Sequence, residues 1–367
     1  MNKITNHIKP LLNFLARPTL LFYALPWLML LLVLGTVAQR YIGLYQSQKL
    51  FFGSFIFWLG VIPLPGAYAA IGMIALALCA KLALKSPLRR HNAGTIIAHA
   101  SVVVLLVGGL ITATTREEGY MVLADGQSGS AVSDYHNREL ALMKNDRALM
   151  NVPRSEVYEG KKITDTQLPF SITVDKYCEN CQVSGITNAS AAMKGLAEKL
   201  TISSIALDPE DAKNQSGAVF EIAGAGEADG TYVTAQALNQ QPEFSIGKDK
   251  YRIVLRQSER NLPFSLKLVK FEKSEYPGTE LARSYRSEVE VTDGGLKWGK
   301  VIEMNEPLRY RGYTFYQSSF VNNDGKLSSV LAVVRNSGNA FPYIAITALC
   351  IGMLIHIAVR ILRRKPA

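Results

Sequence analysis

Long apolar runs alternate with one polar block along this chain. Three runs lie within the first 113 residues, at about 20–38, 60–80 and 95–113, and a fourth covers Phe341–Val359. Each is near the ~20 residues that a helix needs to cross a hydrocarbon core of about 30 Å. The pattern therefore predicts an integral membrane protein with four transmembrane α-helices.

Two of these runs need a closer interpretation. The first contains Thr36-Val37-Ala38, which resembles a cleavage site, but its 19 apolar residues exceed the ~7–15 residues of a signal-peptide core. We therefore expect an uncleaved anchor. The segment 41–65 is rich in aromatic residues and is broken by Pro63 and Pro65. We expect it to be an interfacial stretch that enters a kinked second helix near Phe55.

The block between the third and fourth runs has a different periodicity. Short segments such as Phe170–Tyr177 and Tyr251–Leu255 alternate apolar and polar residues, which is typical of strands. The segments Leu168–Tyr177 and Leu262–Phe271 resemble each other, which suggests two related β units.

The segment Ala189–Ile205 is predicted to be helical. We expect three parts: membrane residues 1–113, a mainly-β, sandwich-like domain of one or two lobes at 114–340, and the fourth span with a basic tail at 341–367.

Charge is distributed unevenly over these parts. All 30 acidic residues lie in the β block, where 27 basic residues leave a net charge of about −3, and the other 13 basic residues lie in the membrane part. Such a distribution indicates membrane topology and argues against nucleic-acid binding. Most of these 13 form three clusters, which four spans place on one side: Lys3, Lys9, Arg17; Lys81, Lys85, Arg89, Arg90; Arg360, Arg363, Arg364, Lys365. The positive-inside rule makes that side cytoplasmic, with both termini, and exports the β domain.

His99 is an ionisable residue inside the third apolar run. Such residues are rare in membrane helices and face a partner or a cavity. His356 lies at a similar depth in the fourth run and Cys79 in the second, so the three could converge on a metal or cofactor. The alternative is that His99 bonds a neighbouring helix and His356 reaches the interface.

Cys178 and Cys181 form a Cys-x-x-Cys pair in the β block. The next residue is Gln182, so the pair is not a covalent haem-attachment motif. A structural disulfide, an inert pair and a thiol-exchange pair all remain open. A complete zinc site is not expected, because the β block has no second pair.

Several stretches together resemble the ResB family of system II cytochrome c biogenesis. The longest is Pro307-Leu308-Arg309-Tyr310-Arg311-Gly312-Tyr313-Thr314-Phe315-Tyr316-Gln317-Ser318-Ser319, and Tyr276-Pro277-Gly278-Thr279 is another. Leu34–Gln39, Phe52-Gly53-Ser54, His99 and Glu118-Gly119-Tyr120 follow the same pattern in the membrane part and just beyond it. The order of the four spans also agrees.

This resemblance implies a subunit of a cytochrome c synthase in a bacterial inner membrane, with its large domain periplasmic or extracellular. Its partners would be a CcsA/ResC-type membrane protein, an apocytochrome c and membrane lipid. The cofactor would be haem b, transported or transiently bound, with His99 as its candidate ligand. No family motif supports His356, which is a weak candidate on the basis of its depth in the fourth run alone. No residue is assigned as catalytic, and the Trp-rich haem motif of the partner is missing. The chain alone is therefore not expected to attach haem.

Two other functions remain open. In the first, the chain is a membrane-tethered thiol reductant that works through Cys178 and Cys181, with a thioredoxin-like protein as a partner. In the second, it is a non-catalytic scaffold that recruits an apocytochrome or another subunit.

Overall fold

A computed structural model describes residues 10, 12–187, 190–279, 281–323 and 325–363. The chain forms two compact units. One consists of Met1–Glu117 with Arg335–Ala367, and the other is Glu118–Val334. The basic residues Lys3, Lys9, Arg364 and Lys365 lie outside the described residues.

Within the described residues, the first unit contains four long helices. They are α2 (Thr19–Ile42), α4 (Ala67–Lys85), α5 (Ala93–Thr115) and α6 (Phe341–Arg363). All four are long and apolar enough to span a membrane, and only 11–22% of each span is buried within the protein. Their apolar side chains therefore face outward, as a lipid solvent requires. The predicted four spans are confirmed.

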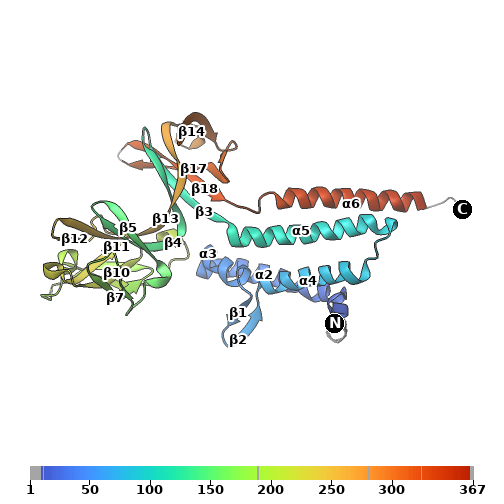
Figure 1. Ribbon diagram of the computed structural model, residues 1–367, viewed down its shortest axis with the longest axis horizontal. Helices are drawn as coiled ribbons and strands as arrows, with labels where there is room; N and C mark the ends of the chain where they lie inside the picture. The colour runs from blue at the N-terminus through green and yellow to red at the C-terminus, as the bar shows by residue number, and fades with distance from the viewer. Residues whose placement is uncertain (1–9, 11, 188–189, 280, 324, 364–367) are drawn as a thin grey trace. The chain divides into compact units, whose positions relative to one another are not determined.

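The helices α5 and α6 run side by side (Figure 1) and approach closely at two glycines. A Cβ atom on Gly94 would lie 2.4 Å from the backbone nitrogen of His356, and one on Gly352 would lie 2.7 Å from that of Ala98. Small residues allow such backbone approach in membrane helices. Glycine is therefore required where the two helices cross, and this crossing brings His356 beside the first turns of α5.

The predicted start of the second span is wrong. Between the short helix α3 (Leu44–Ser47) with its following π-helical turn (Gln48–Phe52) and α4, the chain forms a hairpin of β1 (Ile56–Leu59) and β2 (Ile62–Pro65). Pro63 and Pro65 disfavour helix at the residues before them, and Gly60 supplies a positive φ of 64° at the turn. The helix begins only at Ala67. The hairpin is held to α2 by a hydrogen bond from Trp27 Nε1 to the Pro65 carbonyl, 2.9 Å.

The second unit is an antiparallel β domain with two sheets and a separate hairpin. The larger sheet has ten strands and consists of β3 (Glu117–Ala124), β4 (Ser128–Lys144), β5 (Arg147–Pro153), β12 (Glu243–Ile246), β13 (Asp249–Glu275), β14 (Ala282–Asp293), β15 (Leu296–Glu303), β16 (Leu308–Tyr310), β17 (Tyr313–Asn323) and β18 (Lys326–Arg335). The smaller has four: β6 (Lys162–Ile163), β7 (Ser171–Cys178), β10 (Gly217–Ala223) and β11 (Gly230–Ala235). The hairpin is β8 (Cys181–Gly185) with β9 (Leu200–Ser204). The predicted four-helix, mainly-β fold is confirmed.

Two hydrophobic cores divide this domain into lobes. In one, the end of β4 and the start of β13 pack against the smaller sheet, as in a sandwich, with Phe220 and Ile253 buried between them. In the other, the start of β4 and the later part of β13 combine with β14–β18 around Leu266 and Phe315. The long strands β4 and β13 pair with each other in both lobes.

The repeated segments fall one in each core. In the first copy the buried positions are Leu168, Phe170, Ile172 and Val174, and in the second they are Leu262, Phe264, Leu266 and Leu268. The same alternating positions point inward in both copies, although their surroundings differ. Each lobe therefore contains one copy of the same core-facing strand pattern.

The predicted helix Ala189–Ile205 is wrong over its described part. Residues 190–199 form turns and a short 3-10 helix (Gly195–Glu198), and β9 follows. Pairing with β8 and burial of Ile202 against the Cys178–Cys181 region outweigh the local helical preference of this segment.

Candidate functional site

His99 has both of its ring nitrogens engaged in the helical unit. Its Nδ1 lies 2.7 Å from the carbonyl oxygen of Thr95, one turn earlier on α5. Its Nε2 lies 3.1 Å from Nζ of Lys81 on α4. A carbonyl can only accept a hydrogen bond and an ammonium can only donate one. His99 is therefore the neutral tautomer with its proton on Nδ1, and the Nε2 lone pair faces Lys81.

His356 meets the same turn of α5 from α6. Its Nδ1 lies 3.1 Å from the hydroxyl oxygen of Thr95, so the two histidines contact different atoms of one threonine. A small cavity of about 250 Å³ adjoins this point, and its lining includes Thr95, Ala98 and His356. Thr95 thus connects the two histidines that the sequence singled out.

An apolar groove lies between α4 and α5. Its volume is about 430 Å³, and its lining includes Ala75 and Cys79 from α4 with Val103 and Leu106 from α5. Cys79 is two residues before Lys81, and Val103 is one helical turn after His99. The groove therefore ends about one turn from the Lys81–His99 pair, and Cys79 belongs to its wall.

No group of three or more His, Cys, Asp or Glu side chains in the described part of the chain is close enough to hold a metal ion. Among the described residues, these side chains therefore come together in groups of at most two.

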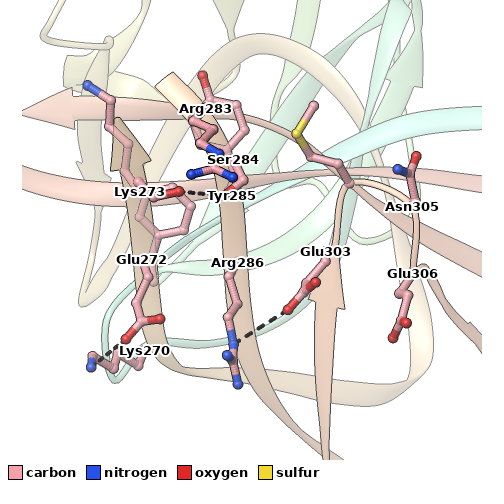
Figure 2. A pocket seen from close by; sticks show the side chains of 13 residues that line it. Lys270, Glu272, Lys273, Arg283, Ser284, Tyr285, Arg286, Glu303, Asn305 and Glu306 are labelled. Carbon is pink, nitrogen blue, oxygen red and sulfur yellow. Dashed lines mark hydrogen bonds and ion pairs between the residues drawn. The ribbon is translucent and has the colours of Figure 1, made fainter. Parts of the chain in front are cut away.

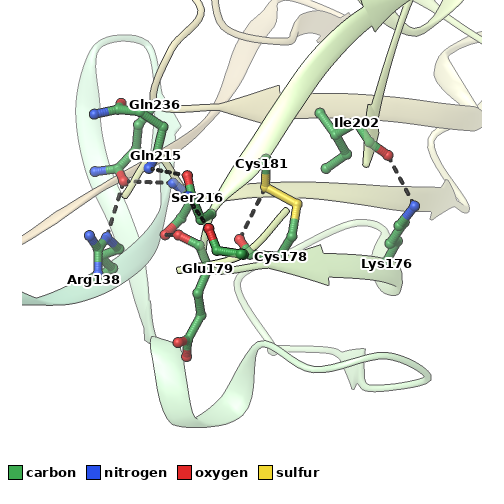
Figure 3. Close-up of a disulfide and its surroundings, with 11 residues drawn as sticks. Arg138, Lys176, Cys178, Glu179, Cys181, Ile202, Gln215, Ser216 and Gln236 are labelled. Atoms are coloured by element: carbon green, nitrogen blue, oxygen red, sulfur yellow. Dashed lines mark hydrogen bonds between the residues drawn. A yellow bond between two sulfur atoms is a disulfide. The ribbon is translucent and has the colours of Figure 1, made fainter. Parts of the chain in front are cut away.

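Cys178 and Cys181 form a disulfide at the turn between β7 and β8 (Figure 3). Cys178 is 3% exposed and Cys181 7% exposed, and both pack against Ile202 and Val233. The turn is also fixed by a hydrogen bond from the Cys181 amide to the carbonyl of Gln215, 2.8 Å. The bridge thus lies inside a small hydrophobic core, where a thiolate has poor access to either sulfur.

Beside this bridge, Arg154 stacks on the ring of Tyr177, with its guanidinium carbon 3.7 Å from the ring centre. Burial raises the pKa of the Tyr177 hydroxyl. That hydroxyl therefore stays neutral near pH 7, and Tyr177 provides packing and a cation–π contact.

A large polar groove opens on the β domain. It has a volume of about 950 Å³ and lies between the outer parts of β13 and β14 and the turn after β15 (Figure 2). Its lining includes the basic residues Lys270, Lys273, Arg283 and Arg286 and the acidic residues Glu272, Glu303 and Glu306. Arg286 and Glu303 are directly opposite each other on the paired strands β14 and β15, and Arg286 Nε lies 3.8 Å from Glu303 Oε1. Both signs of charge therefore line one groove.

Sequence reasoning selected His99, His356 and the cysteine pair, but it missed Lys81 and Thr95 as neighbours of the histidines. In the sequence, Lys81 stands out only as part of a basic cluster. Its depth, close to that of Cys79, was the available signal that its ammonium lies beside the imidazole.

The fold defines a multi-pass membrane protein that carries a β domain between its third and fourth spans. Residues 240–348 match the sequence model of the ResB-like family. A stretch of 95 residues is 36% identical to Protein NrfI of Wolinella succinogenes, and this stretch covers 25% of the chain and 10% of that relative. The later part of the β domain and the start of the fourth span are thus similar to the ResB-like family, in agreement with the sequence resemblance. The family match contains the charged groove but neither His99 nor Cys178.

Proposed function

We infer that this chain is a haem-handling subunit of a cytochrome c synthase complex. The observation that carries this inference is the state of His99. It is a neutral imidazole in a membrane span, with Nδ1 fixed by the backbone carbonyl of Thr95 and Nε2 directed to Nζ of Lys81. A histidine whose Nδ1–H is held by a carbonyl has the tautomer and orientation of a metal ligand.

The residues around His99 fit haem b. Nε2 would bind the iron, and the apolar groove that begins one turn away would accept part of the macrocycle. Thr95 fixes the imidazole through its carbonyl oxygen. His356, which shares Thr95, is the second candidate ligand. When bound, haem would supply the vinyl groups to which the thiols of a client are attached.

The β domain is the part we assign to the client. An apocytochrome c segment is an extended peptide before haem attachment, and a groove with both signs of charge suits such a chain. A CcsA/ResC-type membrane protein would complete the synthase, because this chain lacks the Trp-rich motif assigned to that partner. Membrane lipid would surround the exposed helical faces.

The orientation that we assign follows from charge. Basic residues flank the ends of the spans at the α4–α5 connection and beyond α6, and all acidic residues lie in the polar block. The positive-inside rule then puts both termini in the cytoplasm and the β domain in the periplasm or outside the cell, in a bacterial inner membrane.

Two alternatives make different predictions. A thiol reductant would use Cys178 and Cys181, but their burial argues for a structural clip. A scaffold would depend on the β domain alone. The thioredoxin-like partner remains a prediction tied to the first alternative.

Maturation of a c-type cytochrome in cells that lack the native protein distinguishes these functions. Haem-stained cytochrome c is measured for wild type, His99→Ala and the pair Cys178→Ser/Cys181→Ser, at matched membrane levels. We expect a loss of tenfold or more for His99→Ala and a small effect of the cysteine changes. Loss only with the cysteine changes would support the thiol reductant, and full maturation with every variant would support the scaffold.

A further inference from the structure

The Nε2 atom of His99 is already occupied in this structure. The Lys81 ammonium lies 3.1 Å from it, and because Nδ1 carries the proton that bonds Thr95, Nε2 offers its single lone pair to Lys81. An iron atom would need the same lone pair. Lys81 and an iron ligand are therefore mutually exclusive partners of one nitrogen.

The pair also lowers the cost of two polar groups in a membrane span. An ammonium and an imidazole are expensive in lipid unless each has a partner. Both side chains are partly buried, and each satisfies the other across α4 and α5. Lys81 is four residues before the end of α4, so its long side chain can reach the interface when it leaves the imidazole.

We propose that Lys81 is an intramolecular cap on His99, which holds the imidazole in its ligating tautomer and blocks Nε2 until haem displaces the ammonium. This inference rests on the proposed function of His99. The exchange is one for one. The hydrogen bond between Nζ and Nε2 breaks, a coordination bond from Nε2 to iron forms, and no proton or electron is transferred.

The cap predicts that removal of Lys81 tightens haem binding. In Lys81→Met, haem binding does not have to break a hydrogen bond to Nε2 of His99. A hydrogen bond from a charged donor is strong enough that its loss shifts the affinity for haem by roughly tenfold. Lys81→Arg keeps a donor and is expected to restore the wild-type affinity. Lys85→Met is the matched control, because Lys85 lies one turn further on the same helix and donates to the Ala16 carbonyl instead, at 3.2 Å.

The first test is an optical titration of the full chain in detergent with ferric protoporphyrin IX. We expect a roughly tenfold lower Kd for Lys81→Met and no change for Lys85→Met. The gain should vanish in His99→Ala, because the two changes act on one contact. An unchanged or higher Kd for Lys81→Met, with binding still dependent on His99, would overturn the cap and leave the proposed function intact.

The second test needs no haem. Diethyl pyrocarbonate acylates the unprotonated nitrogen of an imidazole, and mass spectrometry of the peptide that contains His99 gives the rate. We expect faster modification of His99 in Lys81→Met than in wild type or Lys85→Met. Equal rates in all three would overturn the cap, whatever the result of the haem titration.

Discussion

At the scale of single residues, the sequence located the unusual side chains but not their partners. His99 stands out because an ionisable residue is rare in an apolar run. The cysteine pair stands out by its Cys-x-x-Cys spacing. Whether His99 meets Lys81 depends on how α4 packs on α5, and no local pattern encodes that packing. The same holds for Cys178 and Cys181, whose burial comes from Ile202 and Val233 further along the chain.

Surface ion pairs provide a prediction for the β domain. The turn after β4 meets the turn before β13, where Lys144 lies 2.8 Å from Asp249 and Lys250 pairs with Glu243. Hydrogen bonding from Lys144, and then from Asn145, lowers the pKa of Asp249 below its usual range. Lys250, and then Arg252, lower the pKa of Glu243 in the same way.

A carboxyl group with a lowered folded-state pKa stabilises the fold above its ordinary pKa of about 4, and this contribution is lost as pH falls through the lower folded value. We therefore expect the melting temperature of wild type to fall more steeply than that of Asp249→Asn between pH 5 and 3 (roughly the window around those pKa values). Circular dichroism of the full chain in detergent measures both. Parallel curves would show that the ion pair of Asp249 with Lys144 does not contribute.

At the scale of elements, hydrophobic periodicity predicted the helices and strands whose residues have a clear local pattern. The four spans and strands such as Ser171–Cys178 follow from apolar runs and alternation. The hairpin Ile56–Pro65 and the strand Leu200–Ser204 were missed. The hairpin was missed because its prolines interrupt an apolar run. The strand was missed because its pairing with β8 outweighs the helical preference of its residues.

The crossing of α5 and α6 gives a prediction at this scale. Gly94→Ala would place a Cβ atom within 2.5 Å of backbone atoms of α6, whereas Gly109→Ala on the same helix meets nothing within 4 Å. Overpacking of this kind costs about 1–3 kcal/mol. We expect Gly94→Ala to lower the melting temperature of the full chain in detergent, and Gly109→Ala to leave it unchanged. Equal effects of the two changes on the melting temperature would contradict the close approach of α5 and α6 at Gly94.

At the scale of the whole molecule, the distribution of charge predicts the side on which the β domain lies. Leu296, the first residue of β15, and Leu88, between α4 and α5, are both exposed, at 68% and 92%. We expect a membrane-impermeant maleimide to label Leu296→Cys in intact spheroplasts, and Leu88→Cys only after lysis. The reverse pattern would contradict the orientation that we assign.

The two lobes of the β domain could be anticipated in part. The repeated segment indicated two related units, and each copy does lie in its own core. The sharing of β4 and β13 between both lobes could not be foreseen. A strand of 27 residues whose register with β4 shifts along its length has a local pattern like that of two separate strands.

The central claim is that His99 is a haem ligand in the membrane unit. The most direct measurement is the reduced absorption spectrum of the complex purified with its CcsA/ResC-type partner, for wild type and His99→Ala. We predict a b-type haem spectrum in wild type that weakens or shifts in the variant, while Lys85→Met retains it. An identical haem signal in wild type and His99→Ala would contradict the account and assign the ligand to the partner.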